Sequence, residues 1–304
     1  MAYPWLYEFR TNVASQTGED GVLAKIFERI GTRNRFCADL GAHDGYFISN
    51  TWNLLHNEGW AGLCIEADAA PFASLEARYA ERADVHCLHA MATVENSLDA
   101  MLGRVGAPAD LDLLSIDIDG MDLVLWKELI NFRPRVVVIE ANASMSPDIY
   151  FAQVDPAAHI GSSARALVDL ARAKGYELAA HLVSNCVFVL REDFACLEIE
   201  DNSLEALFTS PFVPKVVSDL DGVHYLLKEG PWGFRGMVHS NDLTAHDTDF
   251  DSAVRGLSQM ESGTEMAVNL SGRFGHIAAL HYAYDIREVL RAFIERMKGY
   301  HRPG

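Results

Sequence analysis

Acidic residues stand at the ends of several short apolar runs in this chain. The four carboxylates that end such runs are Asp39, Glu66, Asp117 and Glu140. If the runs are parallel strands, these groups meet at the carboxyl edge of one sheet, where open α/β folds bind their ligands. Such a set would repel a phosphate-rich dinucleotide but not a cation that carries a ribose. The pattern therefore favours a cationic nucleoside.

The stretch RFCADLGAHDGY, residues 35–46, predicts a buried strand, a tight turn and then a helix. Gly41 and Gly45 allow backbone conformations with positive φ and let a ligand come close to the chain. The N-terminus of the expected helix would add unpaired N–H groups. Glu66 follows the turn by about 20 residues, the offset at which a strand-end carboxylate meets the hydroxyls of a bound ribose.

Strands and helices that alternate along the chain are expected to position these residues. Apolar runs predict strands over 36–40, 62–66, 85–90, 111–118 and 135–139, and helical patterns occupy 19–30, 48–57, 68–82, 92–105, 123–130 and 162–174. The runs are too continuously apolar to be half exposed, so we predict a parallel sheet covered on both faces. Strands over 176–182 and 186–190 are joined by three residues only, too few for a crossover, and this pair must be antiparallel. The prediction is a doubly wound, Rossmann-like, seven-stranded and mostly parallel sheet with an antiparallel last strand.

Three regions follow from this division. Residues 1–34 form an N-terminal helical segment, 35–192 the ligand-binding core, and 193–304 a C-terminal extension that covers the site or makes a dimer. Within the extension, 240–263 is polar enough for a surface loop or cover. Residues 286–298 carry an apolar stripe with a capping box and a terminal glycine, which predicts a strong helix.

Composition excludes some classes of protein. The chain has 304 residues, 49% of them hydrophobic, and a net charge of -18, which argues against a surface made for nucleic acid or anionic membrane. No basic and apolar leader and no apolar run of about 18 to 20 residues is present, so we expect a cytoplasmic protein. The five cysteines have no CxxC spacing, and we expect buried free thiols.

The motifs resemble those of a known family. Asp39-Leu-Gly-Ala-His-Asp-Gly45 is similar to the first motif of class I S-adenosylmethionine (SAM)-dependent methyltransferases, and SAM is a cationic nucleoside. More narrowly, the chain resembles the FkbM-like branch over residues 13–192. The segments that carry this resemblance are SQTGED at 15–20, the Asp39–Gly45 motif, IEA at 65–67, LSIDIDG at 114–120 and VVIE at 137–140.

The resemblance implies a role for each matching residue. Gly41, Ala42 and Gly45 would receive the methionine end of SAM, and Asp39 would bond its amino group directly or through water. Glu66 would take both ribose hydroxyls, Met91 and Ala92 would flank the adenine, and Asp117 would sit near the sulfonium and the methyl. Gln16 and Ala67 complete the cofactor-binding set that the resemblance predicts.

A hydroxyl acceptor must also lose its proton. A general base could be His43, His89 or His159, with His43 and Asp117 as the predicted catalytic pair. Alternatively, Mg²⁺ or another divalent cation could lower the hydroxyl pKa, held by oxygen ligands from Asp117, Asp119, Glu140 and Asn142. In catechol-type methyltransferases an Asp-Asn pair follows the fifth strand, and Glu140-Ala-Asn142 departs from that pattern.

Several alternatives remain open at this point. We expect O-methylation of a small hydroxylated acceptor, such as a sugar or natural-product intermediate, by a homodimer, and N-methylation is not excluded. A nucleotide-sugar or NAD-dependent oxidoreductase is disfavoured because the turn is not GxGxxG and no Tyr-x-x-x-Lys pair stands in a suitable place. A SAM-binding partner protein without turnover is the alternative outside the enzymes.

Overall fold

The computed structural model describes residues 5–210 and 212–213, together with five short strands further along the chain. The chain divides into two compact units, 1–210 and 211–304, and the candidate site lies in the first. Among the described residues, no helix has both the length and the apolar character that crossing a membrane requires.

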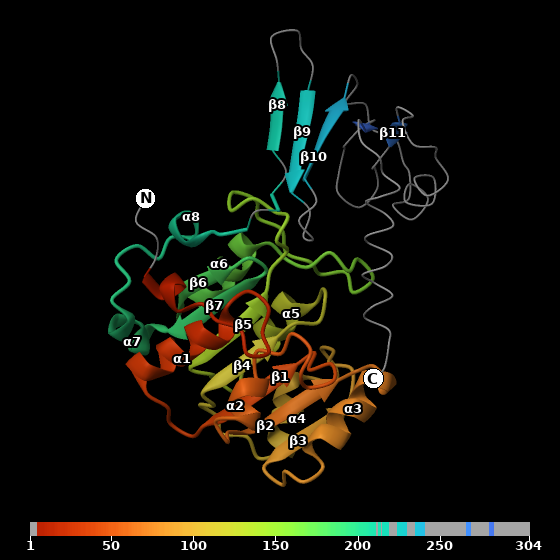
Figure 1. Ribbon diagram of the computed structural model, residues 1–304. Helices are drawn as coiled ribbons and strands as arrows, with labels where there is room; N and C mark the ends of the chain where they lie inside the picture. Colours follow the sequence, from red (N-terminus) through yellow and green to blue (C-terminus); the bar gives the residue numbers. More distant parts are fainter. Residues whose placement is uncertain are drawn as a thin grey trace. The chain divides into compact units, whose positions relative to one another are not determined.

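A seven-stranded sheet forms the centre of the first unit (Figure 1). Its strands are β1 (Phe36–Leu40), β2 (Ala61–Glu66), β3 (Val85–His89), β4 (Leu113–Ile116), β5 (Val136–Glu140), β6 (Tyr176–Leu182) and β7 (Asn185–Leu190). They lie in the order β3-β2-β1-β4-β5-β7-β6. β7 is antiparallel to both of its neighbours, β5 and β6, and all other pairs are parallel. The predicted mostly parallel sheet with an antiparallel closing hairpin is confirmed.

Helices cover both faces of this sheet (Figure 1). The main ones are α1 (Glu19–Ile30), α2 (Trp52–His56), α3 (Ala69–Tyr79), α4 (Leu98–Arg104), α5 (Asp122–Glu128) and α6 (Ala164–Ala173); the short ones are η1 (Trp5–Phe9), α7 (Arg191–Phe194), η2 (Ala195–Leu197) and α8 (Leu204–Leu207). Successive β1 side chains belong to different cores: Phe36 and Ala38 pack with α4, α5 and α6, whereas Cys37 packs with α1, α2 and α3. This alternation explains why the strands are apolar throughout.

Two predicted helices begin later than their patterns indicate. Ile48 has a positive φ of 51°, and α2 therefore begins at Trp52 and not at Ile48. In the helix predicted from residue 92, the Thr93 hydroxyl accepts a hydrogen bond from the Asn96 N–H, and Ser97 then caps α4. Polar side chains form local turns in both places, and such bonds compete with helix formation.

A second sheet of five short strands belongs to residues 211–304, and it was not predicted. The strands are β8 (Lys215–Ser218), β9 (His224–Glu229), β10 (Arg235–Ser240), β11 (Met266–Val268) and β12 (Leu280–Tyr282), all antiparallel, in the order β11-β12-β10-β9-β8. The helix expected over 286–298 and the loop expected over 241–263 lie outside the described residues.

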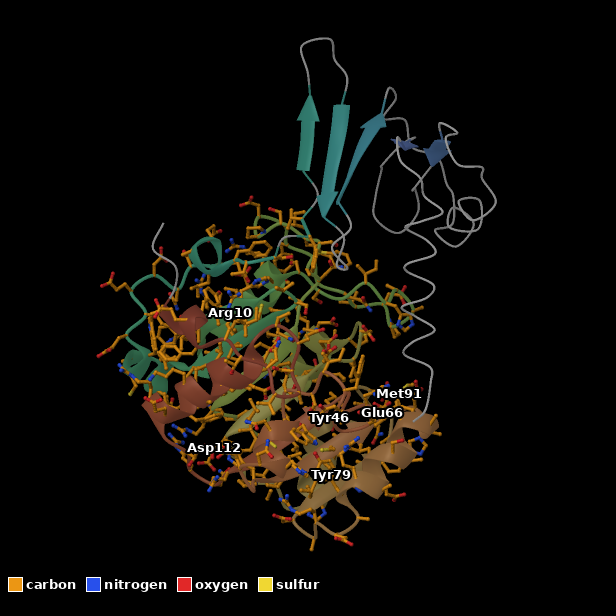
Figure 2. The ribbon with its side chains drawn as sticks, in the orientation of Figure 1. Arg10, Tyr46, Glu66, Tyr79, Met91 and Asp112 are labelled. Carbon is orange, nitrogen blue, oxygen red and sulfur yellow. The ribbon has the colours of Figure 1, made fainter. Side chains whose placement is uncertain are left out.

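A buried ion pair anchors the amino ends of the strands. Arg135 Nη1 donates to Asp112 Oδ1 at 2.9 Å, and both side chains are buried. Asp112 also accepts from the backbone N–H groups of Arg33, Asn34 and Arg35, at the entrance to β1. Arg135 in turn donates to carbonyls at the end of α1. Figure 2 shows Asp112 well separated from Glu66 and Met91.

Loss of this anchor should destabilise the fold strongly. We expect Asp112→Ala to lower the free energy of unfolding by about 3 to 5 kcal/mol, because it leaves Arg135 Nη1 and three backbone donors without their acceptor, while Arg135 Nε keeps its pair with Asp193. Asp110→Ala is the matched control, since the Asp110 carboxylate makes only long, exposed contacts with Arg33 and Asn34, both at 3.5 Å, and its loss should change stability by less than about 1 kcal/mol. Denaturant unfolding of both variants measures the difference, and similar values would contradict this role for Asp112.

Candidate active site

The glycine turn after β1 packs directly against the end of β4. Gly41 has a φ of 90°, and a Cβ added to it would lie 1.8 Å from the carbonyl oxygen of Asp117. Only glycine fits so close an approach. The N–H groups of Gly41 and Ala42 both donate to the carbonyl of Ile65 at 3.0 Å. The turn is thus held between β2 and β4, next to the strand-end carboxylates.

No helix N-terminus follows the turn directly, which differs from the prediction. Residues 41–51 form a loop, and α2, which comes after it, is only five residues long. Asp44 shapes this loop by accepting from the N–H groups of Tyr46 and Phe47 at 2.9 and 2.7 Å. The unpaired N–H groups of a helix N-terminus, which bind phosphate in dinucleotide sites, are therefore not found at Gly41.

Glu66 is held at the end of β2 by two backbone donors. Its Oε2 accepts from the His43 N–H at 2.8 Å and its Oε1 from the Asp68 N–H at 2.7 Å. Each carboxylate oxygen has a second acceptor position, so the group can still receive two hydroxyl hydrogens. A vicinal diol such as that of ribose presents two such donors. The position of Glu66 is fixed by main chain, without a cationic partner.

The end of β3 offers apolar surface. Met91 is 67% exposed and Ala92 is half-buried, while His89 stacks on Phe72 with ring centroids 4.8 Å apart. His89 Nε2 also lies 3.0 Å from the Ala67 carbonyl. Figure 2 shows Glu66 and Met91 in the same region of the molecule. An exposed Met beside a stacked ring pair suits a flat apolar group such as a nucleobase.

Asp39 lies beneath the glycine turn in a buried polar cluster. Its Oδ2 accepts from Thr51 Oγ1 at 2.6 Å and from Ser49 Oγ at 3.4 Å. Burial raises the pKa of the Asp39 carboxyl to about 6, and the nearby charge of Glu66 adds to the rise. Asn50 joins the cluster by donating from Nδ2 to Ser115 Oγ at 3.2 Å. Ser49, Asn50, Thr51 and Ser115 were not predicted as site residues, because their partners lie far apart in the sequence.

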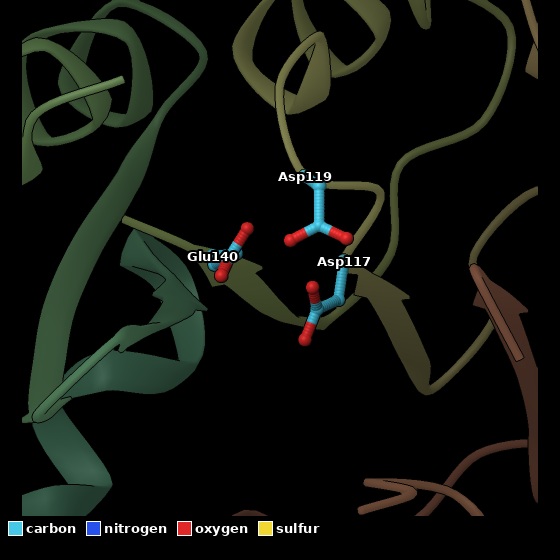
Figure 3. A group of neighbouring side chains, drawn as sticks. All are labelled: Asp117, Asp119 and Glu140. Atoms are coloured by element: carbon cyan, nitrogen blue, oxygen red, sulfur yellow. The ribbon is translucent and has the colours of Figure 1, made fainter. Parts of the chain in front are cut away.

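Three carboxylates converge after β4 and β5 (Figure 3). One oxygen each from Asp117, Asp119 and Glu140 lies within 4.8 Å of the others. Burial raises the pKa of Asp117 to about 7, with further contributions from the charges of Asp122 and Asp119. Burial, followed by the charge of Asp117, holds the pKa of Glu140 well above its usual range. The cluster therefore holds a proton, or attracts a cation, near neutral pH.

Asp122 shapes the turn that carries Asp119, and the sequence analysis missed it. Its two carboxylate oxygens accept from the N–H groups of Ile118 and Gly120, both at 2.9 Å, and Asp119 takes a positive φ of 56° between them. An acid in the first turn of a helix after a strand-end glycine is the signal that could have identified it.

Asn142 is separate from the three clustered carboxylates in its bonding. Its Nδ2 donates to the Ile160 carbonyl at 2.6 Å, and its Oδ1 accepts from both the N–H and the hydroxyl of Ser144. The amide therefore organises the loop between β5 and α6. Of the four predicted metal ligands, the three carboxylates lie together, and the Asn142 amide bonds elsewhere.

The remaining predicted residues lie in exposed loops. The ring of His43 is about half exposed, 3.7 Å from Asp44 through Nδ1, and next to Phe47. His159 is exposed in the loop between β5 and α6. Gln16 is exposed as well, and its amide lies 3.5 Å from Ser184 Oγ in the β6–β7 turn.

The segment around Gln16 is fixed to the closing hairpin. Thr17 donates to the Leu182 carbonyl, and the fully buried Glu19 accepts from Asn185 Nδ2 at 2.8 Å. Asn185 is the register partner of Glu140. The SQTGED segment therefore brings Gln16 to the side of the sheet where Glu140 lies. The N-cap residue of α1 is Gly18, and the Ser15 hydroxyl accepts from the Asp20 N–H in the first turn of the helix.

No protein-family model and no curated protein sequence matches the chain. Solved structures with some similarity include the N-terminal domain of EvdMO1 with S-adenosylhomocysteine bound, at 15% identity and a TM-score of 0.41, covering 58% of this chain and 82% of that one. A SAM-dependent methyltransferase from Aquifex aeolicus matches at 12% identity and a TM-score of 0.34, covering 55% of this chain and 87% of that one. The CMeT domain of the citrinin polyketide synthase matches at 11% identity and a TM-score of 0.37, covering 51% of this chain and 46% of that one.

The chain thus spans about half the length of that polyketide synthase domain, 46%. At these identities and scores, the similarities carry no conclusion about activity or substrate. The geometry described above must support any functional assignment.

Proposed function

We propose that this protein is a SAM-dependent methyltransferase that transfers a methyl group to a small hydroxylated acceptor. The observation that carries the proposal is Glu66, a carboxylate fixed by two backbone donors beside the glycine turn, with acceptor capacity left for a diol. A nucleoside whose ribose binds there extends its 5′ substituent toward the turn at Gly41 and its base toward Met91.

The charge of the site favours a cationic nucleoside. Among the described residues, neither Asp39 nor Glu66 nor the carboxylates after β4 and β5 form an ion pair with Arg or Lys. Unpaired acidic groups attract the positive sulfonium of SAM and repel a pyrophosphate. The loop at 41–51, which replaces a helix N-terminus at the turn, also fits a ligand without phosphate.

Methyl transfer needs the acceptor held in line with the bond between sulfur and methyl, and positioning alone supplies several kcal/mol. Asp117 stands at the end of β4, against the glycine turn, where we infer that the methyl is presented. The raised pKa of Asp117 suits it to accept the hydroxyl proton of the acceptor. His43 is the alternative base.

A divalent cation fits the carboxylates after β4 and β5. Three oxygen ligands within 4.8 Å of each other are typical of Mg²⁺ or Ca²⁺ sites, and a cation there would offset the burial and the repulsion from Asp117 that together raise the pKa of Glu140. Asp117, Asp119 and Glu140 would hold the ion. When bound, it would lower the pKa of an acceptor hydroxyl.

The narrower resemblance to the FkbM-like branch also supports O-methylation of a sugar or natural-product intermediate as the reaction we propose. The SQTGED segment contributes to this proposal, because its contacts fix Gln16 beside the β6–β7 turn. From there we expect Gln16 to contact an acceptor or the cofactor's amino acid end.

Calorimetry tests the cofactor assignment. We expect S-adenosylhomocysteine to bind with a dissociation constant in the micromolar range and NAD not to bind at all at the same concentrations. Transfer of a labelled methyl from SAM to a panel of hydroxylated and amino acceptors then tests the reaction. Absence of S-adenosylhomocysteine binding at millimolar concentration would defeat the proposal, whereas binding without transfer to any acceptor would favour a partner protein without turnover.

A further inference from the structure

A set of five buried polar residues lies under the glycine turn, and we call it the Asp39 cluster. It comprises Asp39, three consecutive loop residues and one β4 residue, at exposures of 1 to 6%: Asp39, Ser49, Asn50, Thr51 and Ser115. Asp39 and Ser115 are register partners on β1 and β4, so their side chains leave the same face of the sheet. The loop lays its three polar side chains over this pair.

Hydrogen-bond donors and acceptors in the Asp39 cluster are not balanced. The hydroxyls of Thr51 and Ser49 donate to Asp39 Oδ2, at 2.6 and 3.4 Å. Asn50 donates from Nδ2 to Ser115 Oγ at 3.2 Å, which leaves its Oδ1 on the other side of the amide. Asn50 Oδ1 is then buried with no hydrogen-bond partner.

The Asp39 cluster lacks a hydrogen-bond donor and a positive charge. The cluster holds one carboxylate without a cationic partner, and one buried acceptor, Asn50 Oδ1, without a donor. A buried acceptor that lacks a donor costs stability, and an unpaired buried charge costs more. A ligand that brings a positive charge and several N–H groups would satisfy both.

We propose that Asn50 is a cofactor-binding residue whose Oδ1, together with the Asp39 carboxylate, accepts hydrogen bonds from the ammonium of the methionine moiety. The inference rests on the proposed function, because it takes SAM as the ligand. An ammonium has three donors in one compact charge. The oxygen is covered by protein atoms, so the ligand reaches it only when Asn50 turns about χ2 and gives up its bond to Ser115. No sequence motif pointed to this residue.

Three ligands and two variants test this role by calorimetry. The ligands are S-adenosylhomocysteine, its deaminated analogue, and 5′-methylthioadenosine, which keeps the adenosine and thioether but lacks both ammonium and carboxylate. Asn50→Leu preserves side-chain volume and removes the acceptor. Asn57→Leu is the matched control, since Asn57 is exposed and bonds only near the end of α2.

We expect Asn50→Leu to weaken S-adenosylhomocysteine binding about 10-fold or more, the effect of losing a hydrogen bond to a charged group. Binding of the deaminated analogue and of 5′-methylthioadenosine should stay within about twofold of the parent protein, and Asn57→Leu should change none of the three. If circular dichroism shows that Asn50→Leu is unfolded, Asn50→Ala takes its place in the same comparison.

The outcomes separate this inference from the proposed function. Equal weakening of all three ligands, or of none, overturns the role of Asn50 while the methyltransferase assignment stands. Binding of 5′-methylthioadenosine as tight as that of S-adenosylhomocysteine in the parent protein also overturns it, because no ammonium site is then in use. If the parent protein binds neither, both the proposed function and the inference fail.

Discussion

Replacing Glu66 by glutamine should weaken S-adenosylhomocysteine binding by at least about a hundredfold, since one hydrogen bond to the ribose is lost and the other no longer has a charged acceptor, and a hydrogen bond to a charged group contributes about 1.5 to 3 kcal/mol. The glutamine keeps one carbonyl oxygen and turns an NH₂ group toward a site that two backbone donors already face. The ribose hydroxyls then meet a donor where they need an acceptor. Calorimetry with the purified variant measures the loss.

A comparison of ligands makes this prediction specific. 5′-Methylthioadenosine carries the same ribose, so Glu66→Gln should weaken it by a similar factor, unlike the Asn50 variant. Glu58→Gln is the matched control, because Glu58 is exposed and pairs only with Arg35 at 3.8 Å. Unchanged binding of both nucleosides by a folded Glu66→Gln protein would exclude Glu66 as the ribose acceptor and move the ligand elsewhere on the sheet edge.

The second large effect is expected at Asp117. Asp117→Asn should lower the turnover of methyl transfer by about 10² to 10⁴, the range for loss of a general base. Binding of S-adenosylhomocysteine, which has no positive sulfur, should change little, while binding of SAM should weaken. Asp148→Asn is the control, because Asp148 is an exposed acid in the loop between β5 and α6. Normal turnover by Asp117→Asn would leave His43 as the base to test.

The free energy of unfolding of Asp117→Asn shows whether a loss of turnover comes from the missing carboxylate or from an unfolded protein. In metal-free protein the pKa of Asp117 is raised from 3.8 to about 7. The unfolded chain therefore releases this proton near pH 4 and the folded chain near pH 7, so the carboxyl lowers the free energy of unfolding as pH rises between them. Asp117→Asn should be more stable than the parent at pH 8 and similar near pH 3.5 by denaturant unfolding.

Chelation distinguishes the base from the cation. If a divalent ion held by Asp117, Asp119 and Glu140 is required, exhaustive chelation abolishes methyl transfer, added Mg²⁺ restores it, and Asp119→Asn raises the concentration of Mg²⁺ that is needed. Activity that survives chelation in protein without stoichiometric metal would dismiss the ion and leave Asp117 as a proton acceptor.

Local sequence patterns predicted most of the helices and strands of the first unit. Each predicted strand of the seven-stranded sheet is present, and α1 has the predicted bounds, because apolar runs and helical periodicity report directly on burial. The start of α2 was wrong because Ser49 and Thr51 bind Asp39, ten and twelve residues earlier. A contact of that kind is set by tertiary structure, and it overrides helix propensity.

Pairings between distant residues could not be predicted. The partners of Asp112 lie in the segment before β1 and at Arg135, and those of Asn50 and Glu19 lie on β4 and β7. A single sequence identifies the residue types but not which of them meet. The five-stranded sheet of the second unit was missed for another reason: three of its strands, such as Met266–Val268, have only three or four residues and are too short to show alternation, and the six residues of β9 and of β10 do not alternate.

The close approach of Gly41 to the Asp117 carbonyl has a thermodynamic consequence. This contact joins the glycine turn to the backbone of Asp117. A ligand that shifts the turn therefore also shifts Asp117. Binding at one place then alters affinity at the other, and linkage requires the two effects to be equal in magnitude and sign. A titration of Mg²⁺ with and without S-adenosylhomocysteine would measure this coupling free energy without any turnover.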